Sequence, residues 1–191
     1  IKNAESSRPN TASEHRILIM YKSKAYLTVL PASSSLSASE LYDKGENYYY
    51  GRGVTKDHTE AVKWYKRAAD KGHDKAMNDL GYMYSNGKGV ATDYREAIKW
   101  YRLAAEKGNV SAMTSIGYMY GQGQGVEQDY WEAMKWYHKA ADKGSATAMY
   151  NIGIYYKNGY GVAQNLGEAK RWLKKSAEKG DEDAIRVLKS L

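Results

Sequence analysis

The residues Gly-x-Gly-Val occur four times in the chain, and each copy is displaced from the previous one by 36 positions without an insertion. The copies begin at Gly51, Gly87, Gly123 and Gly159. The same displacement relates four tryptophans, Trp64, Trp100, Trp136 and Trp172. Self-similarity at a fixed period of this size is typical of stacked supersecondary units, each of which buries its apolar face against its neighbours. The sequence therefore predicts a repeat array, whose function is to be sought where the copies differ.

Residues 73–108 illustrate how the first half of one unit is built. Small, apolar and aromatic residues recur there at three- and four-residue spacing, namely Ala76, Met77, Leu80, Gly81 and Tyr84. This is the period of an amphipathic helix, and it predicts a helix from about Asp74 to Ser85. Gly87 and Gly89 then end the helix, because glycine has low helix propensity and adopts backbone angles that other residues avoid.

The second half of the unit predicts another helix that begins after Asp93. Glu96 follows three residues later, the spacing of a capping box, in which each side chain accepts a hydrogen bond from the backbone N–H of the other residue. Equivalent pairs are Asp57 with Glu60, Asp129 with Glu132 and Asn165 with Glu168. The expected buried stripe comprises Ala97, Trp100, Tyr101, Ala104 and Ala105. We expect the tryptophan column to pack in the core, and Gly108 to provide a left-handed helix end.

The period predicts an all-α solenoid of four helix pairs, spanning residues 37–72, 73–108, 109–144 and 145–180. Residues 181–191 match the start of a further unit and predict a half repeat with one capping helix. The first unit is degenerate, because Glu40 and Lys44 stand where the second unit has Ala76 and Leu80. Terminal repeats of a solenoid are expected to be atypical, since nothing stacks on their outer side.

The pattern Ala-x-x-x-Leu-Gly-x-x-Tyr, Gly-x-Gly-Val and Trp-Tyr-x-x-Ala-Ala-x-x-Gly, seen from Ala76 to Gly108, resembles the Sel1-like repeat, a relative of the tetratricopeptide repeat. The resemblance covers residues 37–191 and implies a right-handed superhelix of antiparallel helix pairs whose first helices line a concave surface. It also implies an adaptor in signalling, secretion or cell-envelope assembly. Some bacterial members resemble secreted, cysteine-rich proteins that bind β-lactams, but this chain has no cysteine to cross-link its repeats.

Composition argues against several kinds of catalytic site. The absence of cysteine removes disulfides, thiolate nucleophiles and cysteine-based metal sites. The four histidines form no i,i+4 pair that could hold a metal on one helix face, and the repeated carboxylates are expected to be helix caps. We therefore predict no catalytic residues, no metal and no cofactor. No apolar run is long enough to span a membrane.

The net charge of +7 raises the alternative of a nucleic-acid partner. Two basic columns recur once per repeat: Lys63, Lys99, Lys135 and Arg171, and Lys71, Lys107, Lys143 and Lys179. Cations near the end of a helix favour its dipole, and lysine stems commonly cover an outer surface. We favour this structural interpretation over phosphate binding.

The concave positions of the tetratricopeptide repeat, transferred residue by residue, indicate a candidate partner-binding surface. Its six central residues are Asn78, Tyr82, Thr114, Tyr118, Tyr150 and Asn151. The first unit contributes Tyr42, Glu46, Tyr49 and Tyr50 at the matching positions. Rigid aromatic rings mixed with amides and hydroxyls are typical of recognition surfaces. We expect the three central tyrosines to contribute most to binding.

The leading hypothesis is thus a non-enzymatic scaffold or adaptor that binds a protein or peptide on its concave face. A narrower version is a bacterial immunity or envelope-assembly protein. The alternative from a different class is an enzyme that binds or hydrolyses β-lactams, as the resemblance to the cysteine-rich relatives implies.

Residues 1–36 do not follow the period, and two interpretations remain open for them. Residues 20–38 resemble a signal sequence, with basic residues before a short apolar core and small residues after it. Residues 16–21 and 25–30 could instead form a two-stranded hairpin that needs to dock on the first repeat. A signal sequence would imply a bacterial periplasmic or secreted protein, and its absence a cytoplasmic one.

Overall fold

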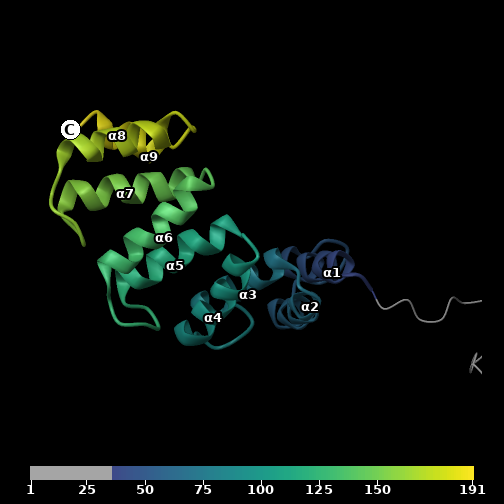
Figure 1. Cartoon of the computed structure of the whole chain (residues 1–191). Helices are drawn as coiled ribbons and strands as arrows, with labels where there is room; N and C mark the ends of the chain where they lie inside the picture. The colour runs from purple at the N-terminus through teal and green to yellow at the C-terminus, as the bar shows by residue number, and fades with distance from the viewer. Residues whose placement is uncertain (1–35) are drawn as a thin grey trace, which may run out of the picture. The chain divides into compact units, whose positions relative to one another are not determined.

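The computed structural model describes residues 36–191, and this part of the chain consists of α-helices and their connections, without a strand (Figure 1). In chain order the helices are α1 (Ala38–Tyr50), α2 (His58–Asp70), α3 (Asp74–Asn86), α4 (Tyr94–Glu106), α5 (Val110–Gln122), α6 (Tyr130–Asp142), α7 (Ala146–Asn158), α8 (Leu166–Ala177) and α9 (Glu182–Leu188). The hairpin predicted from residues 16–21 and 25–30 lies outside the described residues. So does most of the signal sequence predicted for residues 20–38, of which Ser37 is the N-cap and Ala38 the first residue of α1.

Helices α1 to α8 pack as four pairs that follow one another along the described chain (Figure 1). Each helix packs most extensively on the other member of its pair, and the second helix of each pair also packs on the first helix of the next. The short helix α9 packs on α8 and buries Ala184. The predicted all-α repeat solenoid, with a C-terminal half repeat, is therefore confirmed.

A contact between a glycine and an aromatic ring holds each of the first three pairs together. A methyl carbon placed on Gly81 of α3 would lie 2.6 Å from the ring of Tyr101 on α4, closer than carbon atoms approach one another. Gly45 with Tyr65 and Gly117 with Tyr137 repeat this contact. In the fourth pair Leu173 takes the place of the tyrosine. The glycine thus lets the ring lie directly on the backbone of the first helix.

The tryptophan column lies at the edge of the core rather than at its centre, which corrects the expectation from the sequence. The residue after each tryptophan is the buried one: Tyr101 is 5% exposed, whereas Trp100 is only partly buried. Basic side chains one turn later cover three of the four tryptophan rings. Arg67 Cζ lies 4.4 Å from the Trp64 centroid, and Lys139 Nζ and Lys175 Nζ lie 4.1 Å from the centroids of Trp136 and Trp172, respectively. These cations stabilise the partly buried rings.

The second helices begin as predicted, but they lack the reciprocal capping box. Asp93 accepts a hydrogen bond from the Glu96 backbone N–H at 2.9 Å. The Asp93 N–H, however, donates to the carbonyl of Tyr84 at 2.9 Å. Glu96 is therefore left to pair with Lys99, at 3.0 Å. Among the described helices, α1 has the complete capping box, formed by its N-cap Ser37 and by Glu40 in its first turn.

The second glycine of the Gly-x-Gly-Val loop sets the approach between units in the second, third and fourth copies. Gly89 has a φ of +72°, and a methyl carbon placed on it would lie 2.3 Å from the carbonyl carbon of His58 in the preceding unit. Gly53 has the same φ of +72°, but apart from its chain neighbours no atom of residues 36–191 lies within 4 Å of such a methyl. Gly108, with a φ of +90°, confirms the left-handed end predicted after α4.

Alanine substitutions at Gly53 and Gly89 distinguish the stability cost of backbone strain from the cost of crowding between units. A residue other than glycine in the left-handed region costs about 1–2 kcal/mol, so we expect Gly53→Ala to destabilise the protein by about that much. Gly89→Ala should cost about 2 kcal/mol more, because its methyl group would meet the His58 backbone. Urea unfolding of both variants measures the difference. Equal losses would show that the loop does not set the spacing between units.

A second pair of variants tests which aromatic column forms the core. We expect Tyr101→Ala to reduce the free energy of unfolding by about 3–5 kcal/mol, because a buried ring is removed from its contact with α3. Trp100→Ala should cost about 1–3 kcal/mol, since its ring is partly solvated already. Thermal melts and urea unfolding give the order. A larger loss of unfolding free energy for Trp100→Ala than for Tyr101→Ala would contradict the assignment of the core to the tyrosine column.

Candidate binding groove

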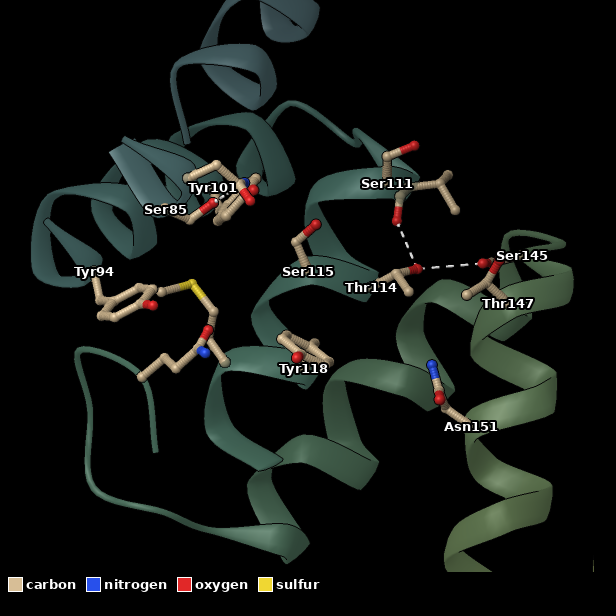
Figure 2. A pocket seen from close by; sticks show the side chains of 14 residues that line it. Ser85, Tyr94, Tyr101, Ser111, Thr114, Ser115, Tyr118, Ser145, Thr147 and Asn151 are labelled. Atoms are coloured by element: carbon tan, nitrogen blue, oxygen red, sulfur yellow. Dashed lines mark hydrogen bonds between the residues drawn. The ribbon is translucent and has the colours of Figure 1, made fainter. Parts of the chain in front are cut away.

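A groove of about 630 Å³ lies over helices α3, α5 and α7 (Figure 2). It is lined by Ser85, Asn86, Tyr94, Tyr101, Val110, Ser111, Thr114, Ser115, Tyr118, Met119, Gln124, Ser145, Thr147 and Asn151. Figure 2 shows Ser85 and Tyr94 on one side, Thr147 and Asn151 on the other, and Ser115 and Tyr118 of α5 between them. The volume lies within the range of ligand sites in proteins.

The lining of the groove is polar, and none of the described residues that form it carries a charged side chain. Serine and threonine supply six of the described lining residues, tyrosine three, and asparagine and glutamine three. The other two, Val110 and Met119, are apolar. Hydroxyl and amide groups both donate and accept hydrogen bonds without a net charge. The groove can therefore bind a neutral polar chain, such as an extended polypeptide backbone, without leaving a charge unpaired.

Hydrogen bonds within the wall hold part of this surface in place. Thr114 Oγ1 donates to the carbonyl of Val110 at 3.1 Å and lies 3.2 Å from Ser145 Oγ, which ties α5 to the start of α7. Ser145 also accepts from the Ala148 N–H as the N-cap of α7. Tyr101, which also lines the groove, is 5% exposed, and burial raises the pKa of its hydroxyl.

The structure brings three of the six predicted residues together in this groove: Thr114, Tyr118 and Asn151. Tyr82 lies in a separate depression with tyrosines of α1, and Tyr150 lies in another beside α9. The Asn78 amide is half-buried and donates to Asp79 at 3.1 Å, so it supports its neighbour rather than lining the groove.

Several lining residues were not among those predicted, because they come from helix starts and connections. Tyr94 begins α4, Gln124 lies in the loop after α5, and Ser145 is the N-cap of α7. One signal was present in the sequence. Lys75 of the second unit is replaced by Ser111 in the third and by Thr147 in the fourth. The uncharged groove thus begins where this repeat position changes from lysine to a hydroxyl residue.

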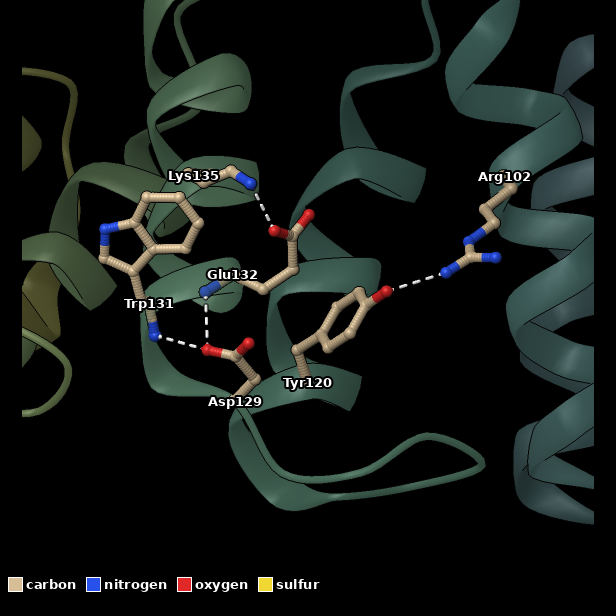
Figure 3. A network of polar contacts seen from close by, with 6 residues as sticks. All are labelled: Arg102, Tyr120, Asp129, Trp131, Glu132 and Lys135. Atoms are coloured by element: carbon tan, nitrogen blue, oxygen red, sulfur yellow. Dashed lines mark hydrogen bonds and ion pairs between the residues drawn. The ribbon is translucent and has the colours of Figure 1, made fainter.

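The outer face carries the basic column that precedes the tryptophans, and glutamates neutralise it. Lys63 pairs with Glu60 at 2.8 Å and Arg171 with Glu168 at 3.1 Å, while Lys135 pairs with Glu132 (Figure 3). A phosphate backbone would have to compete with these carboxylates. This arrangement favours the structural interpretation of the column.

Within residues 36–191, no three His, Asp or Glu side chains lie close enough to hold a metal ion together. No helix in the same range is long and apolar enough to cross a bilayer.

Comparison with known proteins places the architecture in a family. The family model described as Sel1 repeat matches residues 41–73, 74–109, 110–145 and 146–181. A Sel1 repeat protein from Oxalobacter formigenes is 41% identical, with a TM-score of 0.76, over 80% of this chain and 62% of that one. A protective antigen present in uropathogenic Escherichia coli strains is 42% identical, with a TM-score of 0.76, over 79% of this chain and 32% of that one.

Among curated proteins, a component of the ERAD-associated E3 ubiquitin-protein ligase of Arabidopsis thaliana is 42% identical over 45 residues, which are 23% of this chain and 7% of that protein. The chain thus spans less than two thirds of each of these relatives. Because the family model matches most of its length, the chain belongs to the Sel1 repeat family.

Proposed function

We propose that this protein is a non-enzymatic scaffold that binds a peptide or a segment of another protein in the groove over α3, α5 and α7. Sel1 repeats mediate protein interactions, and proteins built from them are generally non-catalytic helical scaffolds. The observation that carries the proposal is the uncharged, hydroxyl- and amide-rich lining of the groove.

A polypeptide matches this lining in its chemistry. Its backbone presents N–H and C=O groups that must be paired when water is removed from them. Asn151 and Ser115 lie along the groove and offer such pairs (Figure 2). Tyr94 and Tyr118 add rigid aromatic surface for the side chains of the ligand, at a low cost in conformational entropy.

Tyr118 is the strongest candidate for a residue that dominates binding. It projects from α5 between the two sides of the groove and is 51% exposed (Figure 2). A half-exposed tyrosine can bury much more of its ring against a partner, and interface hot spots are enriched in this residue. Tyr82 and Tyr150 are then secondary contacts at neighbouring depressions. A specific role as an immunity or envelope-assembly protein stays a prediction.

The test begins with random peptides displayed on phage and selected against the full chain. Enriched peptides are then titrated calorimetrically against wild type and Tyr118→Ala. We expect the variant to bind about 2 kcal/mol more weakly or worse, because its ring is the central aromatic contact. Its melting temperature should stay nearly unchanged, since an exposed side chain contributes little to stability.

Trp131→Ala is the matched control, because this ring is 59% exposed but lies outside the groove. It should leave peptide affinity unchanged. Equal affinity of wild type and Tyr118→Ala, together with weaker binding by Trp131→Ala, would move the site away from the groove. Saturable hydrolysis of nitrocefin that is lost in Tyr118→Ala would instead support the β-lactam alternative and contradict a non-enzymatic role.

A further inference from the structure

A second depression, of about 350 Å³, lies at the N-terminal end of the described array, and we call it the tyrosine cup. It is lined by Tyr42, Glu46, Tyr49, Tyr50, Tyr65, Asp79 and Tyr82. Five aromatic rings and two carboxylates thus come together from α1, α2 and α3. We propose that the tyrosine cup binds the guanidinium or ammonium group of a basic side chain.

The acidic group of the cup is held in a defined position. Asp79 Oδ2 accepts a hydrogen bond from the Tyr42 hydroxyl at 2.9 Å, and Oδ1 accepts one from the Asn78 amide at 3.1 Å. Both donors are neutral, and no ion pair within residues 36–191 involves Asp79. No cation within residues 36–191 therefore pairs with this carboxyl group at the wall of the aromatic depression.

The chain's own cations already use the aromatic faces at the rim. Lys88 Nζ donates to the Tyr49 hydroxyl at 3.2 Å and lies 5.0 Å from the centroid of the Tyr82 ring. Arg52 lies 4.5 Å from the Tyr50 centroid and 3.4 Å from Glu46. Aromatic faces attract cations through their quadrupole, most strongly where water is displaced. Cations thus already contact aromatic faces at the rim of the tyrosine cup, and we assign the same kind of interaction to its interior.

Stacking of the repeats does not require this carboxylate. The position of Asp79 is occupied by Ser115 in the third unit and by Asn151 in the fourth, and both helices pack in the same way. Burial raises the pKa of Asp79, although the hydrogen bonds from Tyr42 and Asn78 oppose this. The charged form is thus less favourable in the folded protein than in water. A binding role explains why a charge stands where a neutral residue would suffice.

The cup and the groove adjoin each other along α3. Tyr82 lines the cup, and Ser85 lines the groove three residues later, which is about 4.5 Å along a helix axis. A peptide in the groove can therefore place a basic side chain in the cup. That the cation comes from a peptide rests on the proposed function, whereas the preference for a cation does not.

Asp79→Asn should not lower the stability of the protein at pH 7. The native pKa of Asp79 is raised, so the wild-type protein loses stability as the pH rises through that pKa, and the amide avoids this loss. We expect the melting temperature of the variant to equal or exceed that of wild type at pH 7. The difference should vanish below the ordinary pKa of aspartate, where the wild-type carboxyl is protonated in both states. The substitution leaves in place the other titratable groups around Asp79, which are Tyr42, Glu46, Tyr49, Tyr50, Tyr65, His73, Tyr82 and Tyr101.

The direct test titrates the ¹⁵N-labelled full chain with N-acetyl-arginine amide and N-acetyl-lysine amide at low salt. N-acetyl-citrulline amide serves as a neutral ligand of nearly the same shape as the first. We expect saturable shifts of the Asp79 and Tyr82 amide resonances with at least one basic ligand, and binding at least about tenfold weaker with citrulline. Asp79→Asn should weaken binding of the basic ligand at least about fivefold. Asp43→Asn, an exposed carboxylate of α1 outside the cup, should not change it.

Equal binding of citrulline and arginine amides, no binding of either basic amide, or full affinity in Asp79→Asn would each overturn the inference. Tyr118→Ala separates this result from the proposed function. The variant should bind the basic amide normally while losing affinity for selected peptides. Basic-amide binding without any peptide binding would leave the cation site intact and contradict the proposed function.

Discussion

The contact of an aromatic ring with a helical glycine is the constraint on which the rest of this structure depends. Because Gly81 has no side chain, the ring of Tyr101 lies against the α3 backbone and fixes the spacing of the pair. Gly89 and the equivalent loop glycines, Gly125 and Gly161, then let each pair approach the backbone of the previous pair. These contacts use residues repeated in nearly every unit. The polar positions on the first helices are left to vary, and the groove and the tyrosine cup lie there.

Most of the fold follows from the period and from local backbone chemistry, which is why helix bounds, N-caps and left-handed ends could be predicted. One error concerned two neighbouring residues that both suit a buried position. Trp100 and Tyr101 are both aromatic and adjacent, and only the direction in which α4 faces α3 makes Tyr101 the buried one. The predicted capping box is absent because of a contact with the preceding helix. The Asp93 N–H donates to the Tyr84 carbonyl, and is therefore not available to the Glu96 side chain.

The candidate site was predictable only in part. Thr114, Tyr118 and Asn151 lie on the expected helix faces and meet in one groove. Tyr82 and Tyr150 occupy equally regular positions, but neighbouring side chains divide the surface into separate depressions. Periodicity identifies which face a residue occupies, whereas the boundaries of a pocket depend on how loops and helix starts meet after stacking. Tyr94 and Ser145, which stand at helix starts, line the groove for this reason and could not be predicted from the period.

A neutral groove beside an acidic aromatic cup suggests a division of roles in recognition, with backbone hydrogen bonding in one and charge selection in the other. The most direct test of this account is hydrogen–deuterium exchange of the full chain with and without a selected peptide. The account predicts that slowed exchange on binding concentrates in α3, α5 and α7, whose residues form much of the groove lining. Slowed exchange confined to α4 and α6, with α5 unchanged, would contradict it.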